Sequence, residues 1–108
     1  MTFDAAIEQA QSEASPSELS KTRVWLAGRY AYLNGLVTEI LKKKPFVWDK
    51  IRNSEGVGSD TQADRKWQMT EDGQNEIQYL RELKSCEKLM SAISSRIKIA
   101  EGEAHGQY

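Results

Sequence analysis

The chain has 108 residues, of which 39% are hydrophobic and 29% charged, and its formal net charge is −1. This composition fits one folded domain better than a disordered chain, whose apolar content would be lower. No apolar run approaches the roughly 20 residues that cross a bilayer, and the acidic start MTFDAAIEQAQ does not resemble a signal peptide. A single cysteine excludes an internal disulfide, so we expect a cytoplasmic protein that does not enter a membrane.

A short helix is predicted over residues 3–14. This segment is rich in Ala and Gln, and its substantial apolar side chains are Phe3 and Ile7. It therefore has little apolar area with which to cover another element.

A long helix is predicted over residues 16–44. In the sequence SPSE, Ser15 can cap the helix, Pro16 can take the first helical position, and Glu18 can close a capping box. Pro45 is expected to end the helix, because proline lacks an N–H donor and disfavours helical geometry at the preceding residue. The core face carries an apolar residue every seven positions, at Leu19, Leu26, Leu33 and Ile40.

A second long helix is predicted to start at SDTQ, residues 59–62, with Ser59 or Thr61 as its cap. Apolar residues step by three and four as far as Ala100. Gly102 is expected to end this helix just after Glu101.

Gly73 is the one place in this helix where we expect a bend or break, and the sequence leaves open whether the helix bends there. We expect residues 1–101 to form one helical domain and residues 102–108 to form a flexible C-terminal tail.

The fold class that follows is all-α, because no segment shows the alternation of a strand. Two long helices with a short connection usually lie antiparallel. We therefore expect an antiparallel hairpin of two long helices, with a short N-terminal helix and a short helical turn, residues 45–52, in the connection. In the simplest register Ile77 faces Tyr30, and Trp67 is buried at the connected end, near Ile40, Phe46 and Trp48.

Small residues recur along the first long helix, with Ala27, Ala31 and Gly35 four apart and Gly28 seven before Gly35. They predict a close crossing of two helices, since small side chains let backbones approach. The helix propensity of alanine is the simpler alternative explanation, although it does not account for glycine.

The register leaves the end of the second long helix uncovered, including Met90, Ile93 and Ile97. Leaving such side chains in water would forfeit about 1.5 to 3 kcal/mol each. The helix over residues 3–14 could fold back over them, but it offers little apolar area. We therefore predict that they bind a protein partner or a second copy of the chain, which would make the protein a homo-oligomer.

Residues that could carry catalysis or bind a metal are few. His105 is the single histidine and is far along the chain from Cys86, so neither a zinc site nor a Cys/His pair can be assembled. Asp72 and Glu76 are one turn apart, but acids near a helix start are simply explained by the helix dipole. We expect a protein that is not an enzyme and has no catalytic residues, metal or cofactor.

Residues 42–52, KKKPFVWDKIR, combine five bases with two aromatic residues. Bases pair with phosphates and aromatic rings stack on unpaired nucleobases. The alternative function is therefore binding of nucleic acid or a nucleotide phosphate through Lys42, Lys43, Lys44, Trp48, Lys50 and Arg52. The competing interpretation is that these lysines favour a helix end while the aromatic residues plug the hairpin.

In overall sequence character, most of the chain resembles the small helical accessory proteins of bacteriophages. The resemblance covers two stretches, KTRVWLAGRYAYLNGLVTEILKKKPFVW and DRKWQMTEDGQNEIQYLRELKSCEKLMSAISSRIKIAEGEA. The resemblance rests on no diagnostic motif and assigns no residue a role. It implies a non-enzymatic protein in the host cytoplasm that binds a host or phage component. Inhibitors of host defence are among the roles that this resemblance implies.

Overall fold

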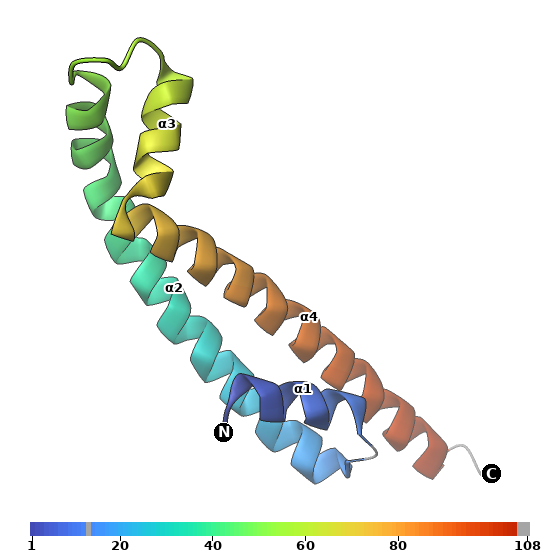
Figure 1. The fold of residues 1–108 in the computed structure, drawn as a ribbon. Helices are drawn as coiled ribbons and strands as arrows, with labels where there is room; N and C mark the ends of the chain where they lie inside the picture. The colour runs from blue at the N-terminus through green and yellow to red at the C-terminus, as the bar shows by residue number, and fades with distance from the viewer. Residues whose placement is uncertain (13, 106–108) are drawn as a thin grey trace. The chain divides into compact units, whose positions relative to one another are not determined.

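The computed structural model describes residues 1–12 and 14–105, and its elements are all helices. They are α1 (Phe3–Gln11), α2 (Pro16–Arg52), α3 (Asp60–Met69) and α4 (Glu71–His105) (Figure 1). The described residues contain no strand, and the two long helices α2 and α4 pack together. The prediction of an all-α hairpin is confirmed.

The start of α2 is the one predicted. The backbone N–H of Glu18 donates to Ser15 Oγ at 3.2 Å, and the backbone N–H of Ser15 donates to Glu18 Oε2 at 3.3 Å. These two bonds form a capping box, which satisfies donors that the first helical turn leaves free.

The predicted end of α2 at Pro45 is wrong, because the helix continues through this proline to Arg52. The segment 45–52 is therefore the last part of α2 and not a separate helical turn. A proline inside a helix removes one backbone hydrogen bond and kinks the axis. Figure 1 shows the axis of α2 changing direction in its green part.

A break after α3 divides what the sequence predicted as one long helix. Thr70 ends α3 by donating its backbone N–H to the Trp67 carbonyl at 3.0 Å. Its Oγ1 also accepts the backbone N–H of Gly73 at 3.0 Å and so caps α4. The break therefore lies three residues before Gly73, the predicted place.

The reason for glycine at position 73 is close packing. A Cβ atom at Gly73 would overlap the carbonyl oxygen of Trp67. Only a residue without a side chain allows the first turn of α4 to lie against the last turn of α3 in this way.

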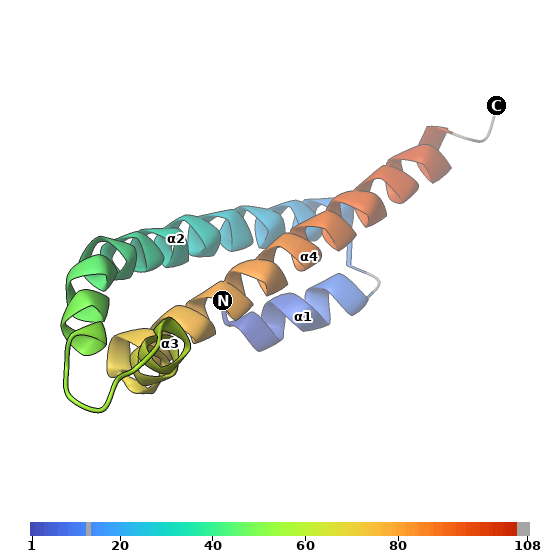
Figure 2. The ribbon, with the colours of Figure 1, turned by 90° about the horizontal axis from the view of Figure 1, so that it is seen from above.

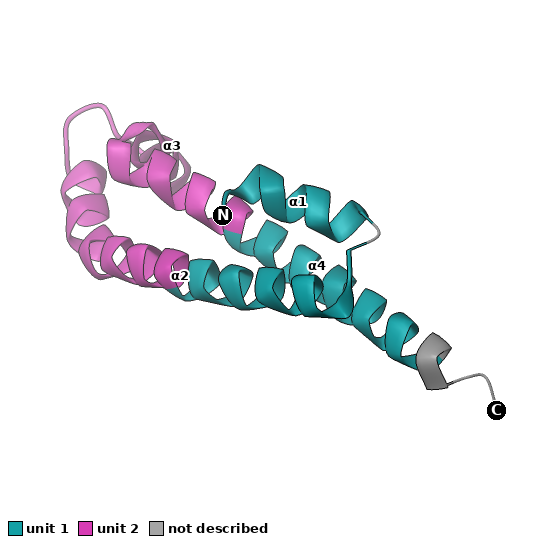
Figure 3. Ribbon diagram, turned by 90° about the horizontal axis from the view of Figure 1, so that it is seen from below, with its two compact units in different colours: residues 1–31, 83–108 teal, residues 32–82 magenta. Residues whose placement is uncertain are grey.

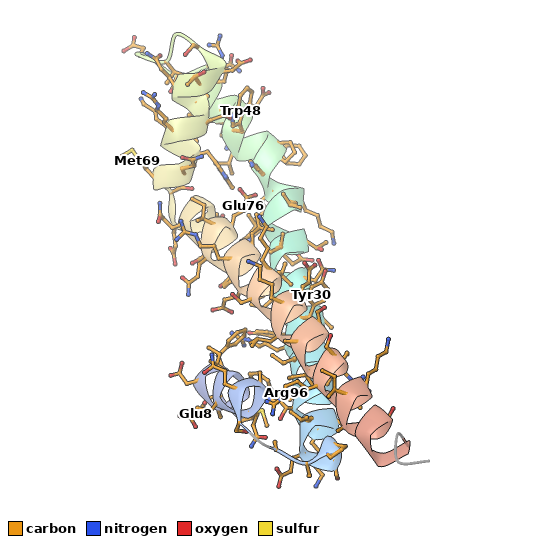
Figure 4. The ribbon with its side chains drawn as sticks, turned by 90° about the vertical axis from the view of Figure 1, so that its right-hand side faces the viewer. Glu8, Tyr30, Trp48, Met69, Glu76 and Arg96 are labelled. Carbon is orange, nitrogen blue, oxygen red and sulfur yellow. The ribbon has the colours of Figure 1, made fainter. Side chains whose placement is uncertain are left out.

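The chain forms two compact units (Figure 3), of which unit 1 comprises residues 1–31 and 83–108. In unit 1, α1 lies along the start of α2 and beside the part of α4 before its last turns (Figure 2). The ring of Phe3 meets Trp25 edge-on with centroids 6.0 Å apart. Arg96 Nη1 donates to the Ala10 carbonyl at 2.6 Å, and Figure 4 shows this side chain directed toward α1. A cation at the carbonyl end of a helix is favourable.

The predicted register is wrong. The Tyr30 hydroxyl donates to Glu87 Oε1 at 3.2 Å, ten residues further along than the expected neighbour Ile77. This hydrogen bond and the charge of Glu87 raise the pKa of Tyr30 above its ordinary value of 10.0. The cause of the shifted register is the longer α2, whose last two turns pair with α3 instead of forming the connection.

The predicted uncovered end of α4 is also wrong. Ile93 is fully buried, Ile97 is 8% exposed, and Met90 is half-buried within the single chain. With the observed register, the start of α2 and helix α1 cover this end of α4. The reason for expecting a partner on these three residues is therefore gone.

The predicted close crossing at small residues does not occur within the chain. Ala27, Ala31, Gly28 and Gly35 are all exposed. A Cβ atom on either glycine would meet no other atom within 4 Å.

At the C-terminal end, the predicted stop at Gly102 is wrong, because α4 runs on to His105. The last residues of the predicted tail, 106–108, lie outside the described residues. The assignment of residues 1–101 to a single domain stays a prediction.

Candidate functional site

Unit 2, residues 32–82, contains all six residues predicted to bind phosphate. They lie on the last three turns of α2, but the structure does not gather their side chains into one patch. Most of them contact other residues of unit 2, as follows.

Lys44 is half-buried and forms a polar cluster with the buried residues Trp67 and Glu76. Its Nζ lies 3.2 Å from Glu76 Oε1 and 5.5 Å from the centre of the Trp67 ring. The Trp67 indole is 2% exposed and donates its N–H to the same carboxylate oxygen at 3.3 Å. Trp67 is therefore a core residue, as predicted, and Figure 4 shows Glu76 close to α2.

Trp48 and Arg52 are held by acids of α3. The indole N–H of Trp48 donates to Asp64 Oδ1 at 2.8 Å, and Arg52 Nε lies 2.9 Å from Asp60 Oδ1. Lys42 pairs with Glu39 one turn earlier at 3.2 Å. Exposed pairs of this last kind are weak, on the order of 0.3 to 0.5 kcal/mol.

The remaining two bases, Lys43 and Lys50, are exposed and have no carboxylate of the described residues within salt-bridge distance. They are seven residues apart and so lie on one face of α2 with Phe46 between them. Phe46 is 74% exposed, which contradicts its predicted place inside the hairpin. Its position on the outer side of α2 follows from the continuation of the helix through Pro45.

A different face of the same helix forms a shallow apolar groove of about 360 Å³, lined by Leu41, Lys44, Pro45 and Trp48. Leu41, Pro45 and Trp48 follow the spacing of one helical face, four and then three residues apart. Leu41 is 50% exposed, and the aliphatic stem of Lys44 supplies the wall on the core side.

Two of the side chains that line this groove are held by polar contacts with other helices of unit 2. Trp48 is held by its hydrogen bond to Asp64 in α3, and Lys44 by its ion pair with Glu76 in α4. Pro45 has no side-chain torsion that can rotate freely. A groove whose walls are held before binding loses little conformational entropy when it is filled.

Leu41 and Pro45 were missed as site residues at the level of sequence. Leu41 is not one of the apolar residues that recur every seven positions up to Ile40, so the sequence pattern does not single it out. Pro45 was interpreted as the end of the helix. The available signal was the spacing of Leu41, Pro45 and Trp48, which becomes visible once the helix is known to continue.

Two further hollows are less suited to binding. One, on α2 in unit 1, is lined by two serines, a lysine and a single apolar side chain, so it is more polar (Ser17, Ser20, Lys21 and Val24). The other is the loop before α3, around Gly56 and Gly58, where the Gly58 N–H already donates to Gln62 Oε1 at 2.6 Å. The loop therefore does not offer this donor to a phosphate.

Two broad properties bear on chemistry. In the described part of the chain, no three residues among His, Cys, Asp and Glu are placed so that they could hold a metal ion. None of the helices over residues 1–12 and 14–105 is long and apolar enough to span a bilayer.

Comparison of the chain with protein-family models, with curated proteins and with solved structures finds no match.

Proposed function

We propose that this protein is a non-enzymatic interaction protein that binds a protein partner through the groove of Leu41, Lys44, Pro45 and Trp48. The observation that carries this proposal is a shallow apolar groove on the surface of α2, in whose lining Leu41 is 50% exposed. Apolar pockets with a fixed aromatic wall are the usual places where partner side chains are anchored.

The ion pairs made by basic residues in the last three turns of α2 support a protein partner over a phosphate. Lys42, Lys44 and Arg52 each have a carboxylate within salt-bridge distance. An anion would have to compete with these carboxylates, whereas an apolar side chain would not. The resemblance to small helical bacteriophage accessory proteins agrees with a binding role on a host or phage component.

The test compares Leu41→Asp with Ile99→Asp. Both replace an exposed aliphatic side chain on a long helix, and Ile99, at 61% exposure, lines none of the hollows described above. We expect affinity capture from host lysate, quantified by mass spectrometry, to lose its partner by at least about tenfold with Leu41→Asp, because a charge is costly in an apolar contact.

Ile99→Asp should keep the partner, and circular dichroism should show the same helix content for both variants. If Leu41→Asp captures the same proteins as the unmodified chain, the groove is not the binding surface.

A second candidate function is binding of single-stranded nucleic acid, favoured by the exposed face of Lys43, Phe46 and Lys50. This face keeps two bases and a ring that can stack. Two phosphate contacts would give a slope of log K against log salt of only ~−1.4, so the binding would be weak.

The second candidate predicts that a fluorescent oligothymidylate binds at low salt and that Lys43→Glu with Lys50→Glu abolishes this binding. Lys84→Glu with Lys88→Glu is the control, because these exposed lysines lie on α4 in unit 1. An equal loss of oligothymidylate binding in both double variants would indicate that the net charge of the protein, and not a specific site, determines binding.

Self-association stays a prediction, without the surface that was first expected to carry it. Sedimentation velocity over a range of concentrations tests it directly: a sedimentation coefficient that stays at the value of a monomer up to high concentration would contradict a homo-oligomer.

A further inference from the structure

Helix α1 contributes little apolar area to unit 1. Ala6 is the buried residue of this helix, Phe3 is half-buried, and Ile7 is 37% exposed. Alanine has a small apolar side chain, so the hydrophobic stabilisation of the docked helix is small. The helix has nine residues, fewer than the roughly 12 to 15 at which an isolated helix is even marginally stable in water. It therefore depends on docking to stay helical.

A buried polar atom opposes the docking of α1. Gln9 Oε1 is buried and has no hydrogen-bond partner among the described residues. When the helix is undocked, water can hydrogen-bond to this oxygen. Docking removes that hydrogen bond and does not replace it, which lowers the stability of the docked helix.

Contacts near the two ends of α1 hold it against both long helices. Near its start, the Phe3 ring meets Trp25 of α2 edge-on, with centroids 6.0 Å apart. At its end, Arg96 Nη1 of α4 donates to the Ala10 carbonyl at 2.6 Å and to the Gln9 carbonyl at 3.4 Å. The arginine thereby satisfies carbonyls that the last helical turn leaves free.

The two long helices have contacts of their own that do not involve α1. Arg23 Nη1 donates to Ser94 Oγ at 3.4 Å, and the Tyr30 hydroxyl donates to Glu87 Oε1 at 3.2 Å. These hydrogen bonds join α2 to α4 directly. Undocking of α1 therefore leaves them intact, while it uncovers the ring of Trp25.

We propose that α1 is a displaceable cover, which undocks and unfolds as one unit while α2 and α4 stay paired. Elements with few buried apolar contacts open in this way at a lower free energy than the rest of a protein. Each opening uncovers the surface of unit 1 that contains Trp25. A surface that is available only in the open form binds with an affinity reduced by the open fraction, so the docking strength of α1 controls access to it. This device goes beyond the proposed function, whose groove lies in unit 2.

Amide hydrogen exchange, measured by NMR on the full chain, tests the proposal. The probes are the amides of residues 6–11 in α1, and the amides of residues 26–33 and 86–93 in the long helices are the reference. We expect the α1 amides to exchange at least about a hundredfold faster than the reference amides, and still more slowly than in an unstructured peptide.

Two variants of α1 should change this exchange in opposite directions. Phe3→Ala removes the ring contact with Trp25 and should speed the exchange of the α1 amides at least about fivefold. Gln9→Met removes the unsatisfied oxygen from a side chain of similar length and should slow it at least about fivefold. The reference amides should keep their rates in both variants. Val24→Ala is the control, because Val24 is next to Trp25 on α2 and is 70% exposed, so its truncation should not alter the exchange of α1.

Three outcomes would overturn the proposal. If the α1 amides are as protected as the reference amides, or if Phe3→Ala changes the rates in all three helices equally, α1 opens only when the whole chain unfolds. If the α1 amides exchange as fast as in an unstructured peptide, the helix is not docked at all. If Gln9→Met speeds the exchange of α1, the amide of Gln9 holds the helix in place, which contradicts the weak docking.

Discussion

At the scale of single residues, Trp67 shows how a tryptophan among charged neighbours can belong to the core. Its neighbours on α3, residues 64–66 and 68–69, are exposed, because only one face of α3 points inward. That face carries Ala63 and Trp67, both buried. The indole N–H is satisfied by Glu76, and Lys44 lies over the ring. A buried tryptophan needs such a partner for its polar atom.

Trp67→Ala is expected to lower the free energy of unfolding by about 3 to 5 kcal/mol, the usual cost of truncating a buried large aromatic residue. Urea denaturation followed by circular dichroism measures this. Phe46→Ala is the control, because Phe46 is 74% exposed and its loss should change stability by no more than about 0.5 kcal/mol. Equal stability of the two variants would mean that Trp67 does not anchor the core.

At the scale of elements, the two predicted helix caps are confirmed, whereas the helix ends predicted at Pro45 and Gly102 are wrong. Ser15 and Ser59 cap α2 and α3 through bonds to residues three positions on. Pro45 and Gly102, by contrast, lie inside helices. A cap is a local hydrogen bond, whereas tertiary packing can outweigh the cost of a proline or glycine in a helix.

The α3–α4 corner gives a prediction at this scale. Gly73→Ala should destabilise the protein by at least about 1 to 3 kcal/mol, because the new methyl group would overlap the Trp67 carbonyl and force the backbone to move.

Gly28→Ala provides the matched control on a long helix. A Cβ at Gly28 meets nothing within 4 Å, so this change should stabilise the protein by about 0.5 to 1 kcal/mol. Thermal unfolding measures both effects, and a stabilising Gly73→Ala would contradict the close approach at the corner.

At the scale of the whole molecule, the pairing of the long helices decides which apolar residues need a partner. The Tyr30–Glu87 and Arg23–Ser94 hydrogen bonds fix the register in unit 1. In this register the end of α4 is covered within the chain, so Ile93 and Ile97 contribute to the core.

Ile93→Asp should therefore destabilise the fold by at least about 3 kcal/mol, because it buries a charge and removes a core side chain. Circular dichroism with urea denaturation measures this. Ile99→Asp, on an exposed position of the same helix, should leave stability nearly unchanged. If Ile93→Asp keeps its stability and changes only the sedimentation coefficient, Ile93 lies in an interface after all.

The sequence by itself determined what depends on neighbours along the chain. The all-helical fold, the capping box of Ser15 and Glu18, the cap at Ser59 and the inward face of Trp67 all follow from periodicity and local hydrogen bonds. The composition of residues 42–52 also identified a cluster of basic and aromatic residues, but the sequence does not show which of them contact acidic side chains.

Only the tertiary structure decided the register, and with it the site. Continuation of α2 through Pro45 and the break at Thr70 depend on packing between residues distant in sequence, such as Lys44 with Glu76 and Trp48 with Asp64. A proline or glycine inside a helix costs about 1 to 3 kcal/mol of stability, and contacts of this kind can outweigh that cost. The resulting shift of ten residues buried Ile93 and Ile97. The continuation of α2 through Pro45 turned Phe46 outward and left Leu41, Pro45 and Trp48 around a groove.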